Sequence, residues 1–452
     1  MGQAVVDDAP LTLEAMAAYL ADGCKPPSEF RIGAEHEKFP FRLGSHDPIP
    51  YDGSDGIFAL LQGMKRFGWE EVREGETLIG LHRGGANVSL EPGGQFELSG
   101  APLETIHDIH EETAQHLAEV KVVGQELAIG FLALGHTPIW TREQVPVMPK
   151  GRYKIMRAYM PKVGRLGLDM MFRTCTVQAN LDFASEADMV LKFRTSLSLQ
   201  PVVTALFANS PFIEGRPSGF LSARANVWTD TDPDRTGLLD FVFQDGFGFQ
   251  TYAEWALDVP MYFAKRDGRY VDLSGRSFRR FVAGELEELP GERATMKDWS
   301  DHTTTMFPEV RLKTYLEMRG ADDGPLSRLS ALPALWAGLL YDDAALHAAW
   351  DLCKGWSRAD RHALRGDANR IGLKAQVAGR SLQAVAQDML AIAREGLRRR
   401  AREREGLADE TSYLSPLDEI AGTGITPADR LLELYEGPWR GEVRNVFDEA
   451  AY

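Results

Sequence analysis

Two glutamates separated by one residue are the first part of this sequence that could do chemistry. Glu35 and Glu37 lie in residues 31–41, a stretch without helical period that reads as a β-strand. Successive strand residues point to opposite faces, so the two carboxylates share one face and His36 takes the other. Neighbouring carboxylates repel each other unless a cation lies between them, and such oxygen ligands suit a hard ion like Mg²⁺. An ordinary solvent-facing strand edge is the alternative, because the motif is too short to be specific.

A second acidic pair follows in residues 87–100. Two short strands are separated there by a Pro-Gly-Gly turn at residues 92–94. Glu91 and Glu97 alternate with apolar residues, so both fall on the polar faces of these strands. A hairpin with one wet side would have the same pattern, and the segment alone does not separate the two interpretations.

Two later strands repeat this arrangement. Gln178 and Asn180 lie on the polar face of one predicted strand, and Glu317 and Arg319 share a face of the last one. Four polar rows on one antiparallel sheet would gather carboxylates without a metal-binding set of His or Cys. Such a cluster suits roughly two or three Mg²⁺ ions that hold a nucleoside triphosphate, since Mg²⁺ binds a few carboxylates plus phosphate oxygens. The sequence has no Walker A motif, so metal and arginine must hold the phosphates.

Apolar residues at helical spacing predict helices that pack around these strands. In the first half of the chain the predicted helices are residues 11–22, 57–67, 102–129 and 186–208. From residue 325 onward the pattern is helical almost throughout. We therefore expect an α+β fold in two parts. Residues 1–325 form a catalytic antiparallel-sheet core with flanking helices, and residues 326–452 form a mostly helical region packed on the same domain.

Two segments rich in Gly and Pro read as loops, residues 146–171 and 209–237. They carry Arg152 and Arg224, and long loops inside a compact domain are more often functional than idle. His107 and His110 lie three residues apart on a predicted helix, as metal ligands can. Acidic neighbours make a solvated helix face the better interpretation of this pair than a zinc site.

Composition narrows the class of protein. The chain has 452 residues, a formal net charge of −16 and a pI of about 5.2. These values argue against nucleic acid or an anionic membrane as a partner. Three cysteines are too few for a disulfide framework, no apolar run has transmembrane length, and the first residues lack the pattern of a signal peptide. We expect a cytoplasmic monomer or homodimer that acts on small molecules.

The motifs that carry these residues resemble the plant-type glutamate–cysteine ligases, which also occur in many proteobacteria. The similarity extends over nearly the whole chain. The matching stretches are Ile32–Phe39, Ser89–Pro102, Met148–Tyr153, Arg173–Phe183, Ala208–Phe212, Trp228–Gly237 and Phe307–Asp322.

This resemblance implies a glutamine-synthetase-like fold, in which a curved antiparallel sheet forms an active-site funnel with helices packed outside. It implies an enzyme that joins L-glutamate to the amine of L-cysteine. ATP is the co-substrate, γ-glutamyl phosphate the intermediate, and γ-glutamylcysteine the product of this first step of glutathione biosynthesis.

The resemblance, together with the alternation of strand side chains between the two faces of the sheet, implies roles for individual residues. The candidate metal ligands are Glu35, Glu37, Glu91, Glu97 and Glu317. Arg319 is expected to act on the transferring phosphoryl group, beside Glu317. Arg152 and Arg224 look like the residues that hold the glutamate carboxylate by bidentate pairing. Gln178 and Asn180 would line the nucleotide or metal floor.

The sequence leaves three alternatives open. A ligase of the same fold could join glutamate to another amine, since no motif identifies a cysteine pocket. A non-catalytic nucleotide-binding relative is a second, but it would be expected to lose carboxylates or Arg319. A hydrolase built on residues 35–37 is a third, and the opposite face of His36 counts against it. Plant members carry two regulatory disulfides, and the four positions that align with these cysteines are His110, Ser330, Leu273 and Glu288.

Overall fold

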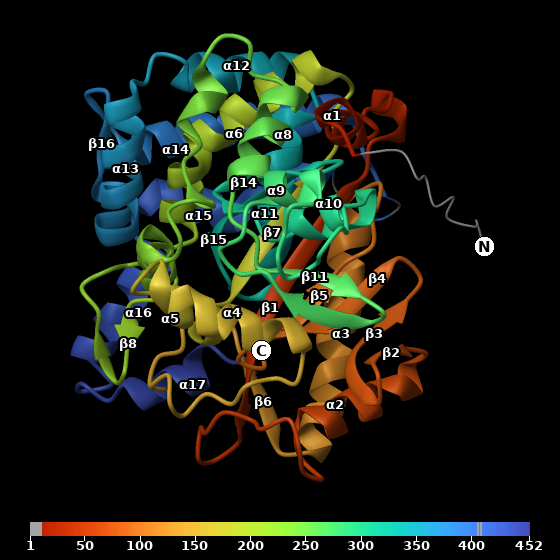
Figure 1. Ribbon diagram of the computed structural model, residues 1–452. Coiled ribbons are helices and arrows are strands. Elements are labelled where there is room, and N and C mark those ends of the chain that lie inside the picture. Colours follow the sequence, from red (N-terminus) through yellow and green to blue (C-terminus); the bar gives the residue numbers. More distant parts are fainter. Residues whose placement is uncertain (1–10, 405, 407–408) are drawn as a thin grey trace.

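A nine-stranded antiparallel sheet forms the centre of the molecule in the computed structural model, which describes residues 11–404, 406 and 409–452 (Figure 1). The strand order is β14-β15-β7-β1-β5-β4-β3-β2, and β6 pairs with β1 beyond this path. The strands are β1 (Ile32–Arg42), β2 (Glu70–Glu74), β3 (Thr77–Arg83), β4 (Ala86–Leu90), β5 (Phe96–Ser99), β6 (Ile129–Leu132), β7 (Thr176–Leu181), β14 (Val310–Leu312) and β15 (Leu316–Asp322). The α+β class and its antiparallel sheet are thus as predicted.

Short two-residue and four-residue strands make separate ribbons outside this sheet. They are β8 (Phe212–Ile213) with β9 (Arg216–Pro217), β10 (Thr236–Gly237) with β13 (Phe307–Pro308), β11 (Phe263–Arg266) with β12 (Arg269–Asp272), and β16 (Gln376–Val377) with β17 (Arg380–Ser381).

The register of the central strands brings the predicted polar rows together. Glu37 of β1 lies opposite Glu97 of β5, and Glu35 lies opposite Gln178 of β7. One strand further, Glu317 of β15 pairs with Asn180. Because side chains that face each other across a ladder lie on the same side of the sheet, these polar residues share one face.

Helices cover the sheet and extend through the second part of the chain. The bounds are α1 (Leu13–Ala21), α2 (Ile57–Met64), α3 (Ile106–Glu126), α4 (Gly151–Tyr159), α5 (Gly167–Arg173), α6 (Glu186–Leu206), α7 (Ala223–Val227), α8 (Phe249–Asp258), α9 (Phe278–Ala283), α10 (Met296–Thr303), α11 (Leu326–Leu340), α12 (Asp343–Cys353), α13 (Arg358–Ile371), α14 (Leu382–Arg400), α15 (Ser415–Thr423), α16 (Pro427–Glu436) and α17 (Val446–Glu449). No helix within the described part of the chain combines the length and apolar character that a membrane crossing needs.

The apolar face of the sheet packs on helices from both parts of the chain. Helix α6 contacts β15, and α11 contacts β7 and β1. The larger hydrophobic core joins Leu181 of β7, Leu197 of α6, Leu335 of α11 and Met389 of α14. The same core thus spans residue 325, and the division of the chain at that residue stays a prediction.

Several local predictions were wrong. Residues 146–171 and 209–237 are not plain loops, because they contain α4, α5 and α7. Gly151 and Gly167 are the first residues of their helices, a position where a helix tolerates residues that usually signal a loop. Burial of Tyr153 and Met156 then holds α4 in place.

The helix predicted over residues 102–129 is shorter than expected. Its first turn begins after Thr105, whose hydroxyl accepts a hydrogen bond from the Asp108 amide, and Ile129 already belongs to β6. His107 is buried rather than solvated, with Nδ1 3.0 Å from the hydroxyl of Tyr413. The charged edge strand β2 was not predicted, because Glu and Arg are uncommon in strands.

Candidate active site

One cavity lies on the polar face of the sheet. Its walls come from β1, β5 and β7 on one side and from α4, α5, α7 and the segment before β14 on the other. Val177 and Ala179 of β7 point into the hydrophobic core, so the intervening Gln178 points into the cavity. The residues that line it include Glu35, Glu37, Glu91, Glu97, Arg152, Gln178, Arg224, Arg311 and Arg319.

Three glutamates form what we call the acidic end of the cavity: Glu37, Glu91 and Glu97. Burial raises the pKa of Glu37 well above its ordinary value, and the charges of Glu91 and Glu97 raise it further. Burial and the charge of Glu91 likewise raise the pKa of Glu97. The main-chain amide of Thr176 donates to Glu37 over 3.2 Å, and the Ser89 hydroxyl donates to Glu97 over 2.7 Å. At Glu37 and Glu97 burial and the neighbouring carboxylates thus outweigh the charges of the nearby arginines.

Glu35 lies between the acidic end and the opposite end of the cavity. Its Oε1 accepts a hydrogen bond of 2.7 Å from Nδ2 of Asn180. Burial raises its pKa to about 7, and the charges of Glu317 and Glu97 add to this shift. Oδ1 of Asn180 is buried without a donor among the described residues, so this amide leaves a polar atom open to a ligand or to water.

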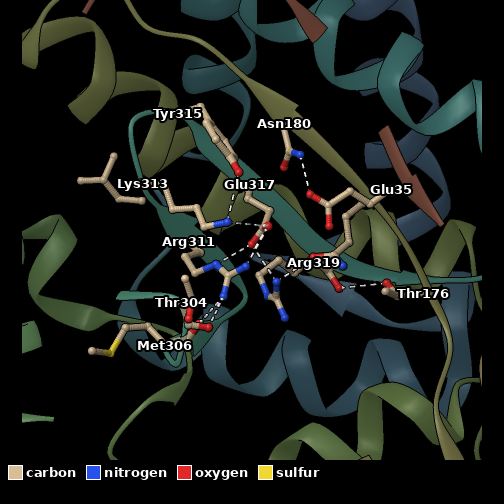
Figure 2. Close-up of polar contacts among 12 residues, drawn as sticks. Glu35, Thr176, Asn180, Thr304, Met306, Arg311, Lys313, Tyr315, Glu317 and Arg319 are labelled. Atoms are coloured by element: carbon tan, nitrogen blue, oxygen red, sulfur yellow. Dashed lines mark hydrogen bonds and ion pairs between the residues drawn. The ribbon is translucent and has the colours of Figure 1, made fainter. Parts of the chain in front are cut away.

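Glu317, Arg311 and Arg319 make up the basic end of the cavity. Arg311 donates from Nε and Nη2 to the two oxygens of Glu317 over 2.6 and 2.9 Å, a bidentate pair. Nη1 of Arg319 donates to the same carboxylate over 2.7 Å, and Lys313 lies 3.9 Å away (Figure 2). Burial would raise the pKa of Glu317, but the charges of Arg311 and Arg319 outweigh it and hold that pKa well below its ordinary range.

The two arginines of the basic end differ in how firmly they are tied. Nη1 of Arg311 also donates to the carbonyl oxygens of Thr304 and Met306, so its guanidinium is fixed on all sides. Arg319 has a second contact through Nη1, 2.7 Å from Oε1 of Gln178. Its Nε and Nη2 have no acceptor among the residues that the structure describes, which leaves them for a ligand. Arg319 lies at a shift in register between Met318 and Ala321, which marks a bulge in β15.

Sequence reasoning missed Arg311 and Lys313, although the signal was present. Both have the odd numbers of Glu317 and Arg319 within residues 307–320, which the sequence offered as the place of its last strand. The prediction assigned only Tyr315, Glu317 and Arg319 to one face, since parity does not carry across a turn whose length is unknown. In the structure β14 and β15 form a hairpin that sets Arg311 opposite Glu317.

Arg152 and Arg224 line the same cavity but have different neighbours. Arg152 lies on α4, with its guanidinium carbon 5.3 Å from the centre of the Tyr153 ring and its charge beside Glu97. Its Nε is buried and has no acceptor in the described part of the chain. Arg224 lies on α7, where Nη2 donates to the carbonyl oxygen of Arg319 over 2.8 Å. Each arginine is thus presented by a helix, and not by a loop as predicted.

The residues present fit a hard cation at the acidic end. Glu35, Glu37, Glu91 and Glu97 all offer oxygen atoms to one cavity, and burial together with their mutual repulsion raises the pKa of those that shift. Across residues 11–404, 406 and 409–452, no three acidic or histidine side chains are already grouped as metal ligands. Both oxygens of Glu317 accept hydrogen bonds from arginine, which sets this residue apart from the other four candidates.

An antiparallel sheet with a carboxylate-lined cavity and helices outside is the arrangement expected of an α+β enzyme that binds a metal-bound nucleotide. Comparison with known proteins gives the family. The family model described as glutamate-cysteine ligase family 2 matches residues 31–449, and the chain belongs to this family.

Full-length relatives agree with this assignment. The chain is 56% identical over 451 residues to the chloroplastic glutamate–cysteine ligase of Arabidopsis thaliana, covering 100% of this chain and 85% of that protein. It is 52% identical to chloroplastic glutamate–cysteine ligase B of Oryza sativa subsp. japonica, covering 100% and 89% of the two chains. The prediction of an enzyme of the plant-type glutamate–cysteine ligase kind is confirmed.

A solved structure supports the fold. The crystal structure of glutamate–cysteine ligase from Francisella tularensis, in complex with AMP, aligns with a TM-score of 0.56 and 10% sequence identity. The alignment covers 93% of this chain and 87% of that one. At this identity the likeness concerns the fold alone.

The predicted cytoplasmic location is contradicted by the relatives. The proteins from Arabidopsis thaliana, Brassica juncea and Medicago truncatula are all named chloroplastic enzymes. The prediction rested on cysteine content and on the absence of a signal-peptide pattern, and a reducing compartment other than the cytoplasm satisfies the first of these equally well.

Proposed function

We propose that this protein joins the side-chain carboxylate of L-glutamate to the amine of L-cysteine at the expense of ATP. The product is γ-glutamylcysteine, the first intermediate of glutathione biosynthesis. The observation that carries the proposal is a single cavity with a carboxylate-rich end and an arginine-rich end, in a chain of this family. A metal-bound nucleotide and an anionic amino acid need both kinds of charge within reach of each other.

The reaction needs the glutamate carboxylate to be activated, because a carboxylate is a poor electrophile. The γ-phosphoryl group of ATP passes to an oxygen of that side chain, which releases ADP and forms an acyl phosphate. The cysteine amine then attacks the acyl carbon, loses a proton and displaces phosphate. Both steps gather negative charge on phosphoryl oxygens, and fixed positive groups lower the barrier by stabilising it.

Arg319 is the residue we assign to that charge. Its Nε and Nη2 have no acceptor among the described residues, while Nη1 is oriented by Glu317 and Gln178. Because Glu317 is itself held by Arg311, the guanidinium of Arg319 is fixed before any substrate binds. A pre-oriented charge costs no reorganisation when the transition state forms.

Glu35, Glu37, Glu91 and Glu97 are the residues we assign to about two or three Mg²⁺ ions, with Glu317 as the least available of the predicted ligands. When bound, Mg²⁺ would neutralise charge on the phosphate oxygens of the nucleotide. For this metal site the protein provides two carboxylates on β1, one directly after β4 and one on β5, together with the residues that hydrogen-bond to them. Gln178 lines the cavity and orients Arg319, whereas Asn180 is not among the lining residues and supports the site by orienting Glu35.

Arg152 and Arg224 are the residues we assign to the carboxylate of the glutamate substrate. Nε of Arg152 is buried without an acceptor among the described residues, which supports this role because such a donor needs a partner. Arg224 is 3% exposed and lines the cavity beside Arg319, within the same polar face. A planar guanidinium can bind a carboxylate through two parallel hydrogen bonds.

A coupled assay of ADP release tests the proposed function. Purified protein is given ATP, Mg²⁺ and glutamate, with cysteine, serine, glycine, 2-aminobutyrate or no amine. We expect release that depends on glutamate and is fastest with cysteine, with γ-glutamylcysteine found by mass spectrometry. Preference for another amine would indicate a different ligase, and no release with any amine would contradict the proposal. Size-exclusion chromatography in the same buffer tests whether the enzyme is a monomer or homodimer, as we expect.

A further inference from the structure

Asp322 lies at the end of β15, outside the cavity lining, and both of its oxygens hold other parts of the chain. Oδ2 accepts hydrogen bonds from the amide of Asn209 over 2.9 Å and from the Ser210 hydroxyl over 2.6 Å. Oδ1 accepts one from the Ser222 hydroxyl over 2.7 Å. The side chain is 1% exposed, so this carboxylate is a buried charge with three donors around it.

The two serines that Asp322 holds also fix the beginning of α7. Ser222 is the residue that caps this helix, and its hydroxyl accepts a hydrogen bond of 3.0 Å from the amide of Ala225. The hydroxyl of Ser210 accepts one of 3.2 Å from the amide of Arg224. One carboxylate thus orients both hydroxyl groups that set the position of the residue assigned to substrate binding.

The other end of the Arg224 side chain returns to the same strand. Its Nη2 donates to the carbonyl oxygen of Arg319, three residues before Asp322 and within the bulge of β15. Burial lowers the pKa of Arg224, and Asp322 is the acidic residue that most strongly opposes this effect. β15 therefore holds Arg224 at two points, at its backbone amide through Ser210 and at its guanidinium directly. The carboxylate of Asp322 is the nearby opposite charge.

We propose that Asp322 is a positioning residue for the substrate carboxylate, acting through Ser210 and Ser222 on the orientation of Arg224. The inference rests on the proposed role of Arg224 and extends it to a residue outside the lining of the cavity. Asp322 does not touch the substrate. It fixes the angle at which α7 presents the guanidinium, and a bidentate contact is sensitive to small errors in that angle.

The experiment compares Asp322→Asn with a matched variant, Glu410→Gln. Glu410 is also a fully buried carboxylate that accepts a backbone hydrogen bond, from Ile106 over 2.8 Å, but it lies away from the cavity. We expect Asp322→Asn to raise the KM for glutamate by about tenfold or more, with the KM for ATP within about twofold of the parent. Glu410→Gln should lower the melting temperature and leave both KM values unchanged.

A second variant guards against misfolding. Ser222→Ala removes one hydroxyl between the carboxylate and α7, and should raise the glutamate KM by about threefold without loss of folded protein. If Asp322→Asn does not fold, the glutamate KM of Ser222→Ala is the measurement that tests the proposal. In an Arg224→Ala background, Asp322→Asn should cause no further rise in the glutamate KM, because its effect passes through the missing side chain.

Two results would overturn the inference, and they are distinguishable. If Arg224→Ala raises the glutamate KM but Asp322→Asn and Ser222→Ala leave it within twofold, Asp322 is structural only and the proposed role of Arg224 stands. If Arg224→Ala itself leaves the glutamate KM unchanged, the assignment of Arg224 fails, and the role of Asp322 fails with it.

Discussion

Glu97 of β5 and Glu317 of β15 are buried carboxylates on the same sheet, yet their pKa values move in opposite directions. Burial and a neighbouring glutamate raise the pKa of Glu97, whereas two arginines hold the pKa of Glu317 well below its ordinary range. The residue type and the secondary structure are the same in both places. The difference comes from the neighbours: Glu91, directly after β4, lies near Glu97, whereas Arg311 of β14 lies opposite Glu317.

This contrast shows how the cavity is divided. The basic end satisfies its carboxylate with two arginines, and Nε and Nη2 of Arg319 have no acceptor among the described residues, so this end can attract phosphate or carboxylate. At the acidic end burial and the neighbouring glutamates outweigh the nearby arginines at Glu37 and Glu97, so this end can attract a cation. Substitutions at the basic end of the cavity should therefore have the largest effects, followed by substitutions at the acidic end. Residues outside these two ends should have smaller effects.

Removal of Arg319 should have the largest effect. Arg319→Met takes away the charge at the basic end that has free donors, and kcat should fall by about a thousandfold, as for other arginines that stabilise phosphoryl transfer. Arg319→Lys should recover part of this loss, because it restores the charge without the fork. Steady-state kinetics with glutamate and cysteine measure both. A kcat within tenfold of the parent in the Met variant would contradict the assignment.

Neutralising the acidic end should have the second largest effect. Glu37→Gln and Glu35→Gln should leave folded proteins whose activity is lower by about a hundredfold, as when a key electrostatic group is lost. Activity measured against Mg²⁺ concentration, with circular dichroism as the control for folding, checks this. Near-normal turnover of both variants at saturating Mg²⁺ would remove these residues from the metal site.

The arginines on α4 and α7 should act on one substrate only. Arg152→Ala and Arg224→Ala should raise the KM for glutamate by about ten- to a hundredfold, since a charge-assisted contact contributes about 1.5–3 kcal/mol. The KM for ATP should change little. If the ATP constant moves instead, the arginine concerned belongs to the nucleotide and the basic end is larger than we describe.

His302 is a group whose pKa shift comes mainly from burial, with a smaller contribution from the charge of Arg235. It is buried, and burial lowers its pKa to about 3, with Nε2 2.9 Å from the carbonyl oxygen of Ala256. Below pH 6.5 the His302 imidazole is protonated in the unfolded chain but stays neutral in the folded protein. The free energy of unfolding therefore falls as the pH falls. Between pH 6.5 and 5 this amounts to about 2 kcal/mol.

Urea unfolding of the wild type and of His302→Gln at pH 7 and pH 5 measures this contribution. Other groups titrate in the same range, and carboxylates with raised pKa values act in the opposite sense, so the difference between the two proteins is the informative quantity. The variant should lose less stability than the wild type between the two pH values. Equal losses would show that His302 does not carry the effect.

The smallest change is expected from oxidation. Cys175 and Cys353 are buried and Cys24 is half-buried; all three are free thiols, and burial raises the pKa of each. Thiols with raised pKa values react slowly. Activity after equilibration with oxidised or reduced dithiothreitol should differ by less than about twofold. A several-fold reversible change, abolished by Cys24→Ser or Cys353→Ser, would reveal a thiol switch.

Strand parity accounts for what the sequence made predictable. A period of two places Glu35 beside Glu37 and Gln178 beside Asn180 on one face, whatever the register turns out to be, and burial of the alternate residues fixes that face. The helices α4 and α7 were not predictable in this way, because each is short and follows residues typical of turns, Pro149 and Gly151 at the start of α4 and the cap Ser222 before α7.

The supporting contacts were less predictable still. Asp322 and Arg224 are almost a hundred residues apart in the sequence, and nothing in either segment indicates the other. The same holds for the tie between Arg319 and Gln178, which depends on a bulge that has no clear sequence signal. Residues that line the cavity follow an alternating pattern within one strand, which the sequence shows. Residues that orient them come from distant segments, and only the folded structure brings them together.

The position of β1 has a consequence for how the chain is made. This strand is synthesised near the beginning, but it ends up inside the sheet, paired with β5 and β7, and Glu35 meets Asn180 across 145 residues of sequence. Until β7 leaves the ribosome, residues 32–36 of β1 lack their partner on one edge, and helix α11, which contacts β1, is made later still. Unpaired edges of this kind favour association with other chains. Newly made protein should therefore pass through a stage that exposes this edge, and the cavity can form only after its last lining residue, Arg319, has been added.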